Sequence, residues 1–501
     1  MLKVGGLLVV GCWTLVVGYS SMDDLIPLAL EASSAAGASY SDIRLQDIRS
    51  QDLLLRNGSI GTLTDQTSAG FGVRVLVDGA WGFASSHRLE KDEVARITAL
   101  AVAAARAAAA RKGPPVRLAP VDPAVAAWRT PCTRDPFAVP LEEKLDLLRR
   151  VDRILRAKPE IVVAESGMSF QSRRQTLATS EGSRIDQTLV RSGAGYSATA
   201  SGHGDTQTRS YPLSLGGQNV GGGYEAVASL GLVENAERVR DQAITLLTAE
   251  PCPSGTFDLI LDSTQLALQI HESAGHPSEL DRVLGIEESL AGRSFLTLEK
   301  RGAFRYGSPL VTLMADGTLP GGVATYAHDD DGVPAKRYPI VERGTFVNYA
   351  TNREFWHQAG LHESGGTCRA EGWNRLPMIR IPNLSLQPGR GRLEDLIADT
   401  KDGILMSMNR SWSIDQLRYN FQFGCEIGWR IRNGKRAGLL KNPTYQGITP
   451  EFWGSCDAVC GTEEFGLWGV VNCGKGHPMQ RGEMSHGAAP ARFRKVRAGI
   501  A

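Results

Sequence analysis

The chain has 501 residues, of which 42% are hydrophobic and 22% charged, and its formal net charge at pH 7 is +1. One hydrophobic core rarely serves a chain of this length, so we expect more than one domain. The even balance of acidic and basic residues argues against a nucleic-acid-binding surface.

Residues 1–21 form a hydrophobic extension. Residues 4–19 are uncharged, a run shorter than the usual membrane span of about 20 residues and near the upper length of the apolar part of a signal peptide. A signal peptide and a membrane anchor therefore stay open, but a start codon assigned too early is the interpretation we favour. Without a translated extension, we expect a cytoplasmic protein that does not associate with membranes.

Residues 22–249 are predicted to form an N-terminal α+β domain in which helices pack on a sheet. Gly and Asn or Asp at positions 57–58 and 78–79 indicate hairpin turns, and 181–182 indicates a third turn. A proline-dotted linker is expected over 112–136. The expected helices are 23–35, 89–111, 142–157 and 236–248, with strand-like segments over 42–55 and from 157 to about 230.

Residues 250–501 are predicted to form the second domain of an α+β protein. Glycine is frequent there, and the segments 378–385 and 421–431 have strand-like composition. We therefore expect an antiparallel, barrel-like body that carries one functional helix.

That helix is expected to follow a buried strand over 257–262. Asp262 and Ser263 are good N-cap residues, and Leu266 and Ile270 supply apolar surface. Pro277 should end the helix, because the residue before a proline is disfavoured in helical geometry.

The end of this helix carries the motif His271-Glu-Ser-Ala-Gly-His276. Neutral imidazoles bind Zn²⁺ without adding charge, and a carboxylate such as Glu272 can accept a proton from a metal-activated water. In a regular α-helix His271 and His276 would point about 140° apart. A single π-type turn absorbs one residue and brings them together, and Gly275 is the residue expected to allow it.

A catalytic zinc ion usually has three protein ligands, so a third is needed. The carboxylates at 279, 281, 287 and 288 are candidates, although a solvated acidic face is the more ordinary interpretation of most of them. Cys473 and His477, in a glycine-rich segment far downstream, are the other candidates.

The eight cysteines are scattered at 12, 132, 252, 368, 425, 456, 460 and 473. This spacing favours free thiols in a reducing compartment over a disulfide framework. Cys456 and Cys460 form a pair that lacks the second pair of a zinc ribbon, so metal binding there is not favoured. His362-Glu363 has no second histidine at useful spacing, and a loop is predicted.

Several motifs resemble the TldD branch of the TldD/PmbA family over residues 22–501. Besides 271–282 they are Asp316–Gly322, Asp330–Ala335, Arg369–Trp373, Asn420–Gly424, Glu426–Trp429 and Asn472–Gly476. The resemblance implies a zinc metallopeptidase with His271, His276 and Cys473 as metal ligands and Glu272 as general base. It also implies unfolded or extended peptide substrates that bind as an added β-strand. The protein is expected to form a homodimer, or a heterodimer with a PmbA-type subunit that lacks the motif.

One position departs from the family pattern, since glutamine is expected where this chain has His477. We interpret His477 and His486 as residues that line the pocket or support the ligands. Two rival functions remain. One is a thiol hydrolase with Cys473 as nucleophile and His477 as base, and the other is a non-catalytic subunit that binds peptides.

Overall fold

The structure is a computed structural model that describes residues 24–111, 113–214 and 216–499. The predicted hydrophobic extension and Cys12 lie outside the described residues. In the described part of the chain, no helix is long and apolar enough to cross a membrane.

A long twisted sheet forms most of the N-terminal half. Its strand order is β3-β2-β1-β5-β6-β4, with β7 and β8 also paired to β6. The predicted hairpin turns join β1 to β2, β2 to β3 and β5 to β6. The strands are β1 (Tyr40–Arg56), β2 (Ser59–Val77), β3 (Ala80–Ser86), β4 (Val125–Arg129), β5 (Ile161–Thr179), β6 (Arg184–Gly202), β7 (Asp205–Tyr211) and β8 (Gln218–Gly221).

The prediction of a proline-dotted linker over 112–136 missed the strand β4. This strand pairs in parallel with the start of β6, from Val125 opposite Arg184 to Arg129 opposite Thr188. The prolines that suggested a linker flank the strand and do not enter it. A short edge strand fixed by long-range pairing leaves little trace in local composition.

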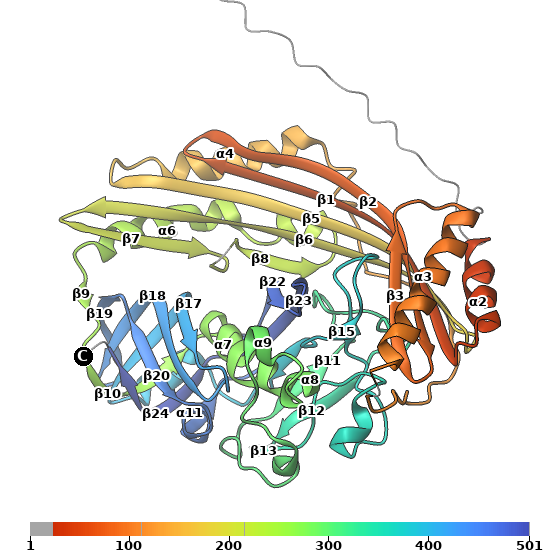
Figure 1. Ribbon diagram of the computed structural model, residues 1–501. Helices are drawn as coiled ribbons and strands as arrows, with labels where there is room; N and C mark the ends of the chain where they lie inside the picture. The colour runs from red at the N-terminus through yellow and green to blue at the C-terminus, as the bar shows by residue number, and fades with distance from the viewer. Residues whose placement is uncertain (1–23, 112, 215, 500–501) are drawn as a thin grey trace, which may run out of the picture.

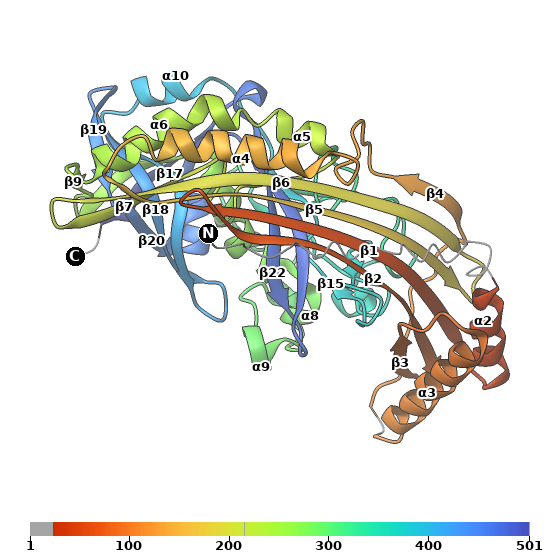
Figure 2. The ribbon, with the colours of Figure 1, turned by 90° about the horizontal axis from the view of Figure 1, so that it is seen from above.

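Two groups of helices cover opposite ends of this sheet (Figure 2). At one end α2 and α3 bury apolar residues of β1 and β2, and at the other α4 and α6 form a separate core with β5 and β6. The helices are α2 (Leu25–Ala35), α3 (Lys91–Ala109), α4 (Leu141–Leu155), α5 (Tyr224–Ala228) and α6 (Leu232–Leu246).

The C-terminal half contains a closed barrel. The order β17-β10-β24-β20-β18 returns to its start because β17 also pairs with β18. β19, β9 and β21 extend it. The strands are β9 (Glu250–Pro251), β10 (Gly255–Leu261), β17 (Asp402–Ile414), β18 (Asn420–Arg432), β19 (Lys435–Lys441), β20 (Thr444–Ile448), β21 (Cys456–Val459) and β24 (Ala491–Ala498).

A second sheet lies beside the barrel, with β22 at its edge in the order β13-β12-β11-β16-β23-β22. The strand expected over 378–385 is divided, since Pro382 separates β15 from β16 and has no N–H for a sheet. The strands of this sheet are β11 (Leu313–Asp316), β12 (Arg337–Glu342), β13 (Thr345–Phe346), β16 (Leu384–Leu386), β22 (Gly466–Lys475) and β23 (Gln480–Ala488). β14 (Cys368–Arg369) and β15 (Met378–Ile379) pair with each other in a separate two-stranded sheet.

The predicted α+β class and the barrel-like body are confirmed. The C-terminal sheets are not purely antiparallel, however, because β10 pairs with β17, and β16 with β23, in parallel. The remaining helical elements are short: α7 (Ser263–Ile270), η1 (His271–Gly275), η2 (His276–Ser278), α8 (Leu280–Val283), α9 (Glu288–Ala291), η3 (Leu298–Lys300), η4 (Trp356–Ala359), α10 (Leu393–Ala398), α11 (Thr449–Gly454) and η5 (Thr462–Glu464).

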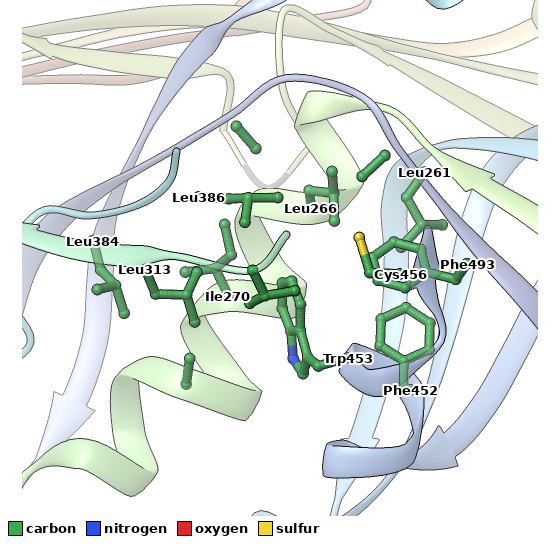
Figure 3. Packing of buried hydrophobic residues seen from close by; sticks show 14 of the residues in the cluster. Leu261, Leu266, Ile270, Leu313, Leu384, Leu386, Phe452, Trp453, Cys456 and Phe493 are labelled. Carbon is green, nitrogen blue, oxygen red and sulfur yellow. The ribbon is translucent and has the colours of Figure 1, made fainter. Parts of the chain in front are cut away.

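Helix α7 lies between the barrel and the second sheet, at the centre of the C-terminal core (Figure 3). Leu266 and Ile270, both fully buried, are part of that core. Leucines of the second sheet and Phe452, Trp453 and Phe493 of the barrel side surround them. This packing fixes the helix whose end carries the motif.

The N-terminal sheet arches over the C-terminal half (Figure 1). Buried polar contacts join the two halves: the Arg209 guanidinium donates to Glu426 at 2.6 Å, and Arg74 pairs with Asp331 at 2.9 Å. The side-chain amide of Gln218 on β8 contacts the backbone of β22, accepting from Gly469 N–H at 3.0 Å and donating to the Leu467 carbonyl.

Candidate metal centre

The motif begins where α7 ends. Asp262 caps the helix as predicted, its Oδ1 accepting from the Gln265 N–H at 3.0 Å. After Ile270 the backbone changes to a π-helical turn over His271–Gly275. The predicted π-type turn is therefore confirmed.

Gly275 is needed for a different reason from the one predicted. Its φ of −62° is ordinary helical geometry, so the turn does not depend on conformational freedom. A Cβ added there would lie 2.9 Å from Ile381 Cδ1. The absent side chain is what lets the motif pack against the fully buried Ile381.

Hydrogen bonds orient both imidazoles. His271 Nδ1 lies 2.8 Å from His486 Nε2, and His486 Nδ1 lies 3.1 Å from the Leu384 carbonyl oxygen. Because a carbonyl only accepts, His486 donates from Nδ1 and its Nε2 accepts from His271. His276 Nδ1 donates to Glu279 at 2.9 Å. Each motif histidine thus keeps a free lone pair on Nε2.

Cys473 of β22 lies beside these nitrogens. Its Sγ is 3.4 Å from His276 Nε2, and one ligand atom from each of His271, His276 and Cys473 can be chosen so that all lie within 4.8 Å of one another. Nitrogen and sulfur bound to one tetrahedral zinc ion would be about 3.5 Å apart. The donor set and spacing therefore fit zinc.

Burial sets the protonation of these groups. It lowers the pKa of His276 to about 3, against the opposing effect of Glu279, and it lowers that of His271 well below its usual range. Burial also raises the pKa of Cys473 to about 11. The imidazoles are therefore neutral, as metal ligands must be, and the thiol requires a nearby cation to ionise.

Glu272 is buried beside the same cavity. Its Oε2 accepts a hydrogen bond from Arg418 Nη1 at 2.8 Å. Burial raises the pKa of Glu272, and the Arg418 cation opposes that rise.

A cavity of about 300 Å³ opens over these groups. Its lining combines the motif with the β22 edge at Val470–Gly474, Trp412 and Arg418 from the hairpin of the barrel, and Leu213 and Asn219 from the N-terminal half. A larger cavity of about 760 Å³ lies at the barrel around Phe421 and Arg494, away from the motif. We place the site in the smaller cavity, because it holds the metal-capable group.

The predicted solvated acidic face was wrong for three of its four carboxylates. Glu279 and Asp281 are buried around the Lys475 ammonium at 3.1 and 2.7 Å, and Glu287 accepts from the Gly476 N–H at 3.1 Å. Glu288 alone is exposed. The buried lysine, two residues beyond Cys473, holds the Cys473 strand near Glu279, which orients His276.

The other predicted residues lie elsewhere. His477 is in the exposed turn after β22 and does not line the cavity. Cys456 and Cys460 are buried free thiols among the described residues, and His362-Glu363 is in a loop as predicted.

Sequence reasoning missed Arg418. It is 146 residues from Glu272 in the chain and stands in a hairpin turn, two residues before the Asn420–Gly424 motif and outside it. His486 was considered, but its bond to His271 depends on the pairing of β16 with β23.

Family models match most of the chain. The model described as the PmbA/TldA metallopeptidase C-terminal domain matches residues 254–497, and those of domain 1 and the central domain match 41–110 and 134–247. A metalloprotease of Methanocaldococcus jannaschii is 30% identical over 438 residues, 87% of this chain and 92% of that protein. The chain belongs to the TldD/PmbA metallopeptidase family.

Other members extend the comparison. A protein named zinc metalloprotease TldD homolog, from Saccharolobus solfataricus, is 22% identical over 266 residues, 52% of this chain and 55% of that protein. A solved structure from Thermotoga maritima, described as a putative modulator of a DNA gyrase, aligns with a TM-score of 0.76 at 18% identity. It covers 96% of this chain and 100% of that one, and shows a shared fold.

Proposed function

We propose that this TldD/PmbA family member is a zinc-dependent peptidase. The observation that carries the proposal is the convergence of one ring nitrogen from each of His271 and His276 with the Cys473 thiol, in the cavity that also holds Glu272. A zinc ion held by His271, His276 and Cys473 would supply Lewis acidity, which makes a water molecule easier to deprotonate.

The chain's own residues perform the proton transfers. Glu272 takes a proton from the attacking water and returns it to the leaving amine. His486 and Glu279 hold the two imidazoles in the tautomers that expose Nε2. Residues of the N-terminal half, among them Leu213 and Asn219, form part of the cavity wall.

The substrate class we propose is an extended peptide. β22 is an edge strand, and between Val470 and Cys473 its register with β23 is broken beside the cavity. Gln218 covers the backbone at Leu467 and Gly469, so strand addition is expected at Val470–Asn472. A peptide that the protein cleaves should no longer bind once its backbone nitrogens are methylated. Unchanged affinity of the methylated peptide would contradict strand addition.

The experiment that tests the function is Glu272→Gln with zinc content measured in parallel. Turnover of an unfolded peptide should fall by at least about 100-fold, while zinc stays at one ion per chain. Unchanged turnover would contradict the role of Glu272.

A homodimer, or a heterodimer with a motif-lacking relative, remains our proposal for the assembly. The molecular mass of the protein in solution tests it.

A thiol hydrolase is the second candidate, because Cys473 Sγ lies 3.4 Å from His276 Nε2 with Glu279 behind the imidazole. The predicted base His477 does not line the cavity. The raised pKa of Cys473 and the lowered pKa of His276 disfavour the thiolate–imidazolium pair that this chemistry needs. Activity that survives removal of metal by a chelator would favour this candidate.

A further inference from the structure

We propose that Arg418 is a catalytic residue whose guanidinium binds the carbonyl oxygen of the scissile peptide bond and stabilises its negative charge in the tetrahedral intermediate. This inference rests on the proposed peptidase function. It adds the Arg418 guanidinium to the proposed zinc ion as a second group that can stabilise negative charge in the site.

The first observation is the position of Arg418 in the cavity. Among the described residues that line the cavity, Arg418 is the only lysine or arginine. Its Nη1 is 2.8 Å from Glu272 Oε2, so the cation lies next to the carboxylate that would receive the proton of the attacking water. The carbonyl under attack must lie close to the same carboxylate, because one water molecule is shared between them.

The second observation is spare hydrogen-bonding capacity. A guanidinium has five N–H donors in a planar fork. Arg418 Nη1 donates to Glu272, whereas Nε is buried and has no hydrogen-bond partner among the described residues. An unpaired buried donor is costly in a folded protein and calls for an explanation. The side chain lines the cavity and is 15% exposed, so a substrate oxygen can accept from the accessible part of the fork.

The third observation is the backbone at Arg418. Its φ is +65°, a left-handed conformation that is unfavourable for a non-glycine residue. The surroundings hold it there: Arg418 N–H donates to the Asp415 carbonyl at 3.0 Å, and Thr449 Oγ1 donates to the Arg418 carbonyl at 2.9 Å. The hairpin tip therefore fixes where the side chain leaves the backbone, and the bond from Nη1 to Glu272 orients the guanidinium, as electrostatic preorganisation requires.

Hydrolysis of the peptide bond requires no proton donor or acceptor beyond Glu272 and the attacking water. The water oxygen bonds to the carbonyl carbon while Glu272 takes one water proton, and the carbonyl π electrons move onto the oxygen that Arg418 binds. On collapse those electrons reform the carbonyl, and the C–N bond breaks with its pair on nitrogen. The nitrogen then takes the proton from Glu272, leaving a carboxylic acid, which ionises, and an amine.

A simpler role for Arg418 is that of a positioning residue that only holds Glu272. The two roles differ when Glu272 is already replaced. A contact with the substrate oxygen persists in the Glu272→Gln background, whereas an effect transmitted through the carboxylate disappears there.

The test measures binding by calorimetry in zinc-loaded Glu272→Gln protein, with and without Arg418→Met. The two ligands are an N-acetylated alanine pentapeptide and its phosphinic analogue, whose tetrahedral oxyanion replaces the central peptide bond. Arg418→Met should weaken binding of the analogue by about 100-fold and that of the ordinary peptide by less than about 3-fold. Arg418→Lys should recover part of the loss.

Arg436→Met is the matched control, because it removes an exposed arginine that pairs with Glu394 at 2.7 Å on the same barrel. It should leave both affinities unchanged. Zinc content and thermal melting of every variant exclude unfolding as the cause.

The proposal would be overturned if Arg418→Met weakened the binding of both ligands equally, or weakened neither. A loss of analogue affinity seen only when Glu272 is intact would also overturn it, in favour of the positioning role. If the wild-type protein binds no zinc or cleaves no peptide, the proposed function itself fails and this inference falls with it.

Discussion

At the scale of the residue, the orientation of the proposed metal ligands depends on side chains that are not themselves proposed ligands. His271 is oriented by His486, which is in turn fixed by the Leu384 carbonyl. His276 is oriented by Glu279. Such partners fix the tautomer of a histidine ligand and raise its basicity.

Replacing His486 by alanine should therefore weaken zinc binding by about 10- to 100-fold, because His271 Nδ1 loses its acceptor. Competition with a chromophoric chelator measures the affinity. His477→Gln is the control and should have no effect, since His477 is exposed outside the cavity. The reverse order of effects would show that the downstream turn supplies the ligand.

The sequence predicted these residues unevenly. The two histidines and the glutamate lie within one six-residue motif, so the sequence alone suggests their role in metal chemistry. Arg418 meets Glu272 through tertiary structure alone. The burial of Glu279 and Asp281 was missed because their partner, Lys475, is almost 200 residues away.

At the scale of the element, the π-helical turn is the feature that brings His271 and His276 together. Its existence follows from the five-residue spacing of the histidines and could be predicted. The reason for Gly275 could not, because it depends on Ile381 from a distant segment.

Gly275→Ala should destabilise the protein by about 1–3 kcal/mol, because the new Cβ would overlap Ile381 in a packed core. Denaturant unfolding measures the change. A second substitution, Ile381→Val, should recover part of the loss. Gly454→Ala in α11 is the control, since a Cβ there meets open space. Equal stability of the Gly275 variant and wild type would show that the site tolerates a Cβ.

The hairpins of the N-terminal sheet were predictable from their turn residues, whereas β4 was not. Asn57-Gly58 and Asp78-Gly79 adopt positive φ at the tips of hairpins, a local requirement that composition reveals. β4 is defined by its pairing with β6, which no local pattern encodes.

At the scale of the whole molecule, buried ion pairs join the N-terminal and C-terminal halves. Arg191 on β6 pairs with Glu483 on β23, and both are nearly inaccessible. Burial would raise the pKa of Glu483, but Arg191 and neighbouring arginines together lower it to about 2.

The stability that this carboxylate contributes should depend on pH. A glutamate has a pKa of about 4.3 in the unfolded chain, so the contribution is complete above that pH and is lost as the pH falls towards 2. Its size is on the order of 3 kcal/mol. Glu483→Gln should lower the free energy of unfolding by this order at pH 7, and the difference from wild type should shrink below pH 4.

Urea unfolding across this pH range provides the measurement. Glu463→Gln, at an exposed glutamate on η5, is the control and should change little. A difference between wild type and Glu483→Gln that grew on acidification would contradict the predicted sign.

The central claim is that one zinc ion is held by His271, His276 and Cys473. X-ray absorption at the zinc edge of the metal-loaded protein tests it most directly. We predict one sulfur at about 2.3 Å and two imidazole nitrogens at about 2.0–2.1 Å, with the sulfur lost in Cys473→Ser. Zinc without a sulfur neighbour, or a spectrum unchanged in Cys473→Ser, would contradict the account.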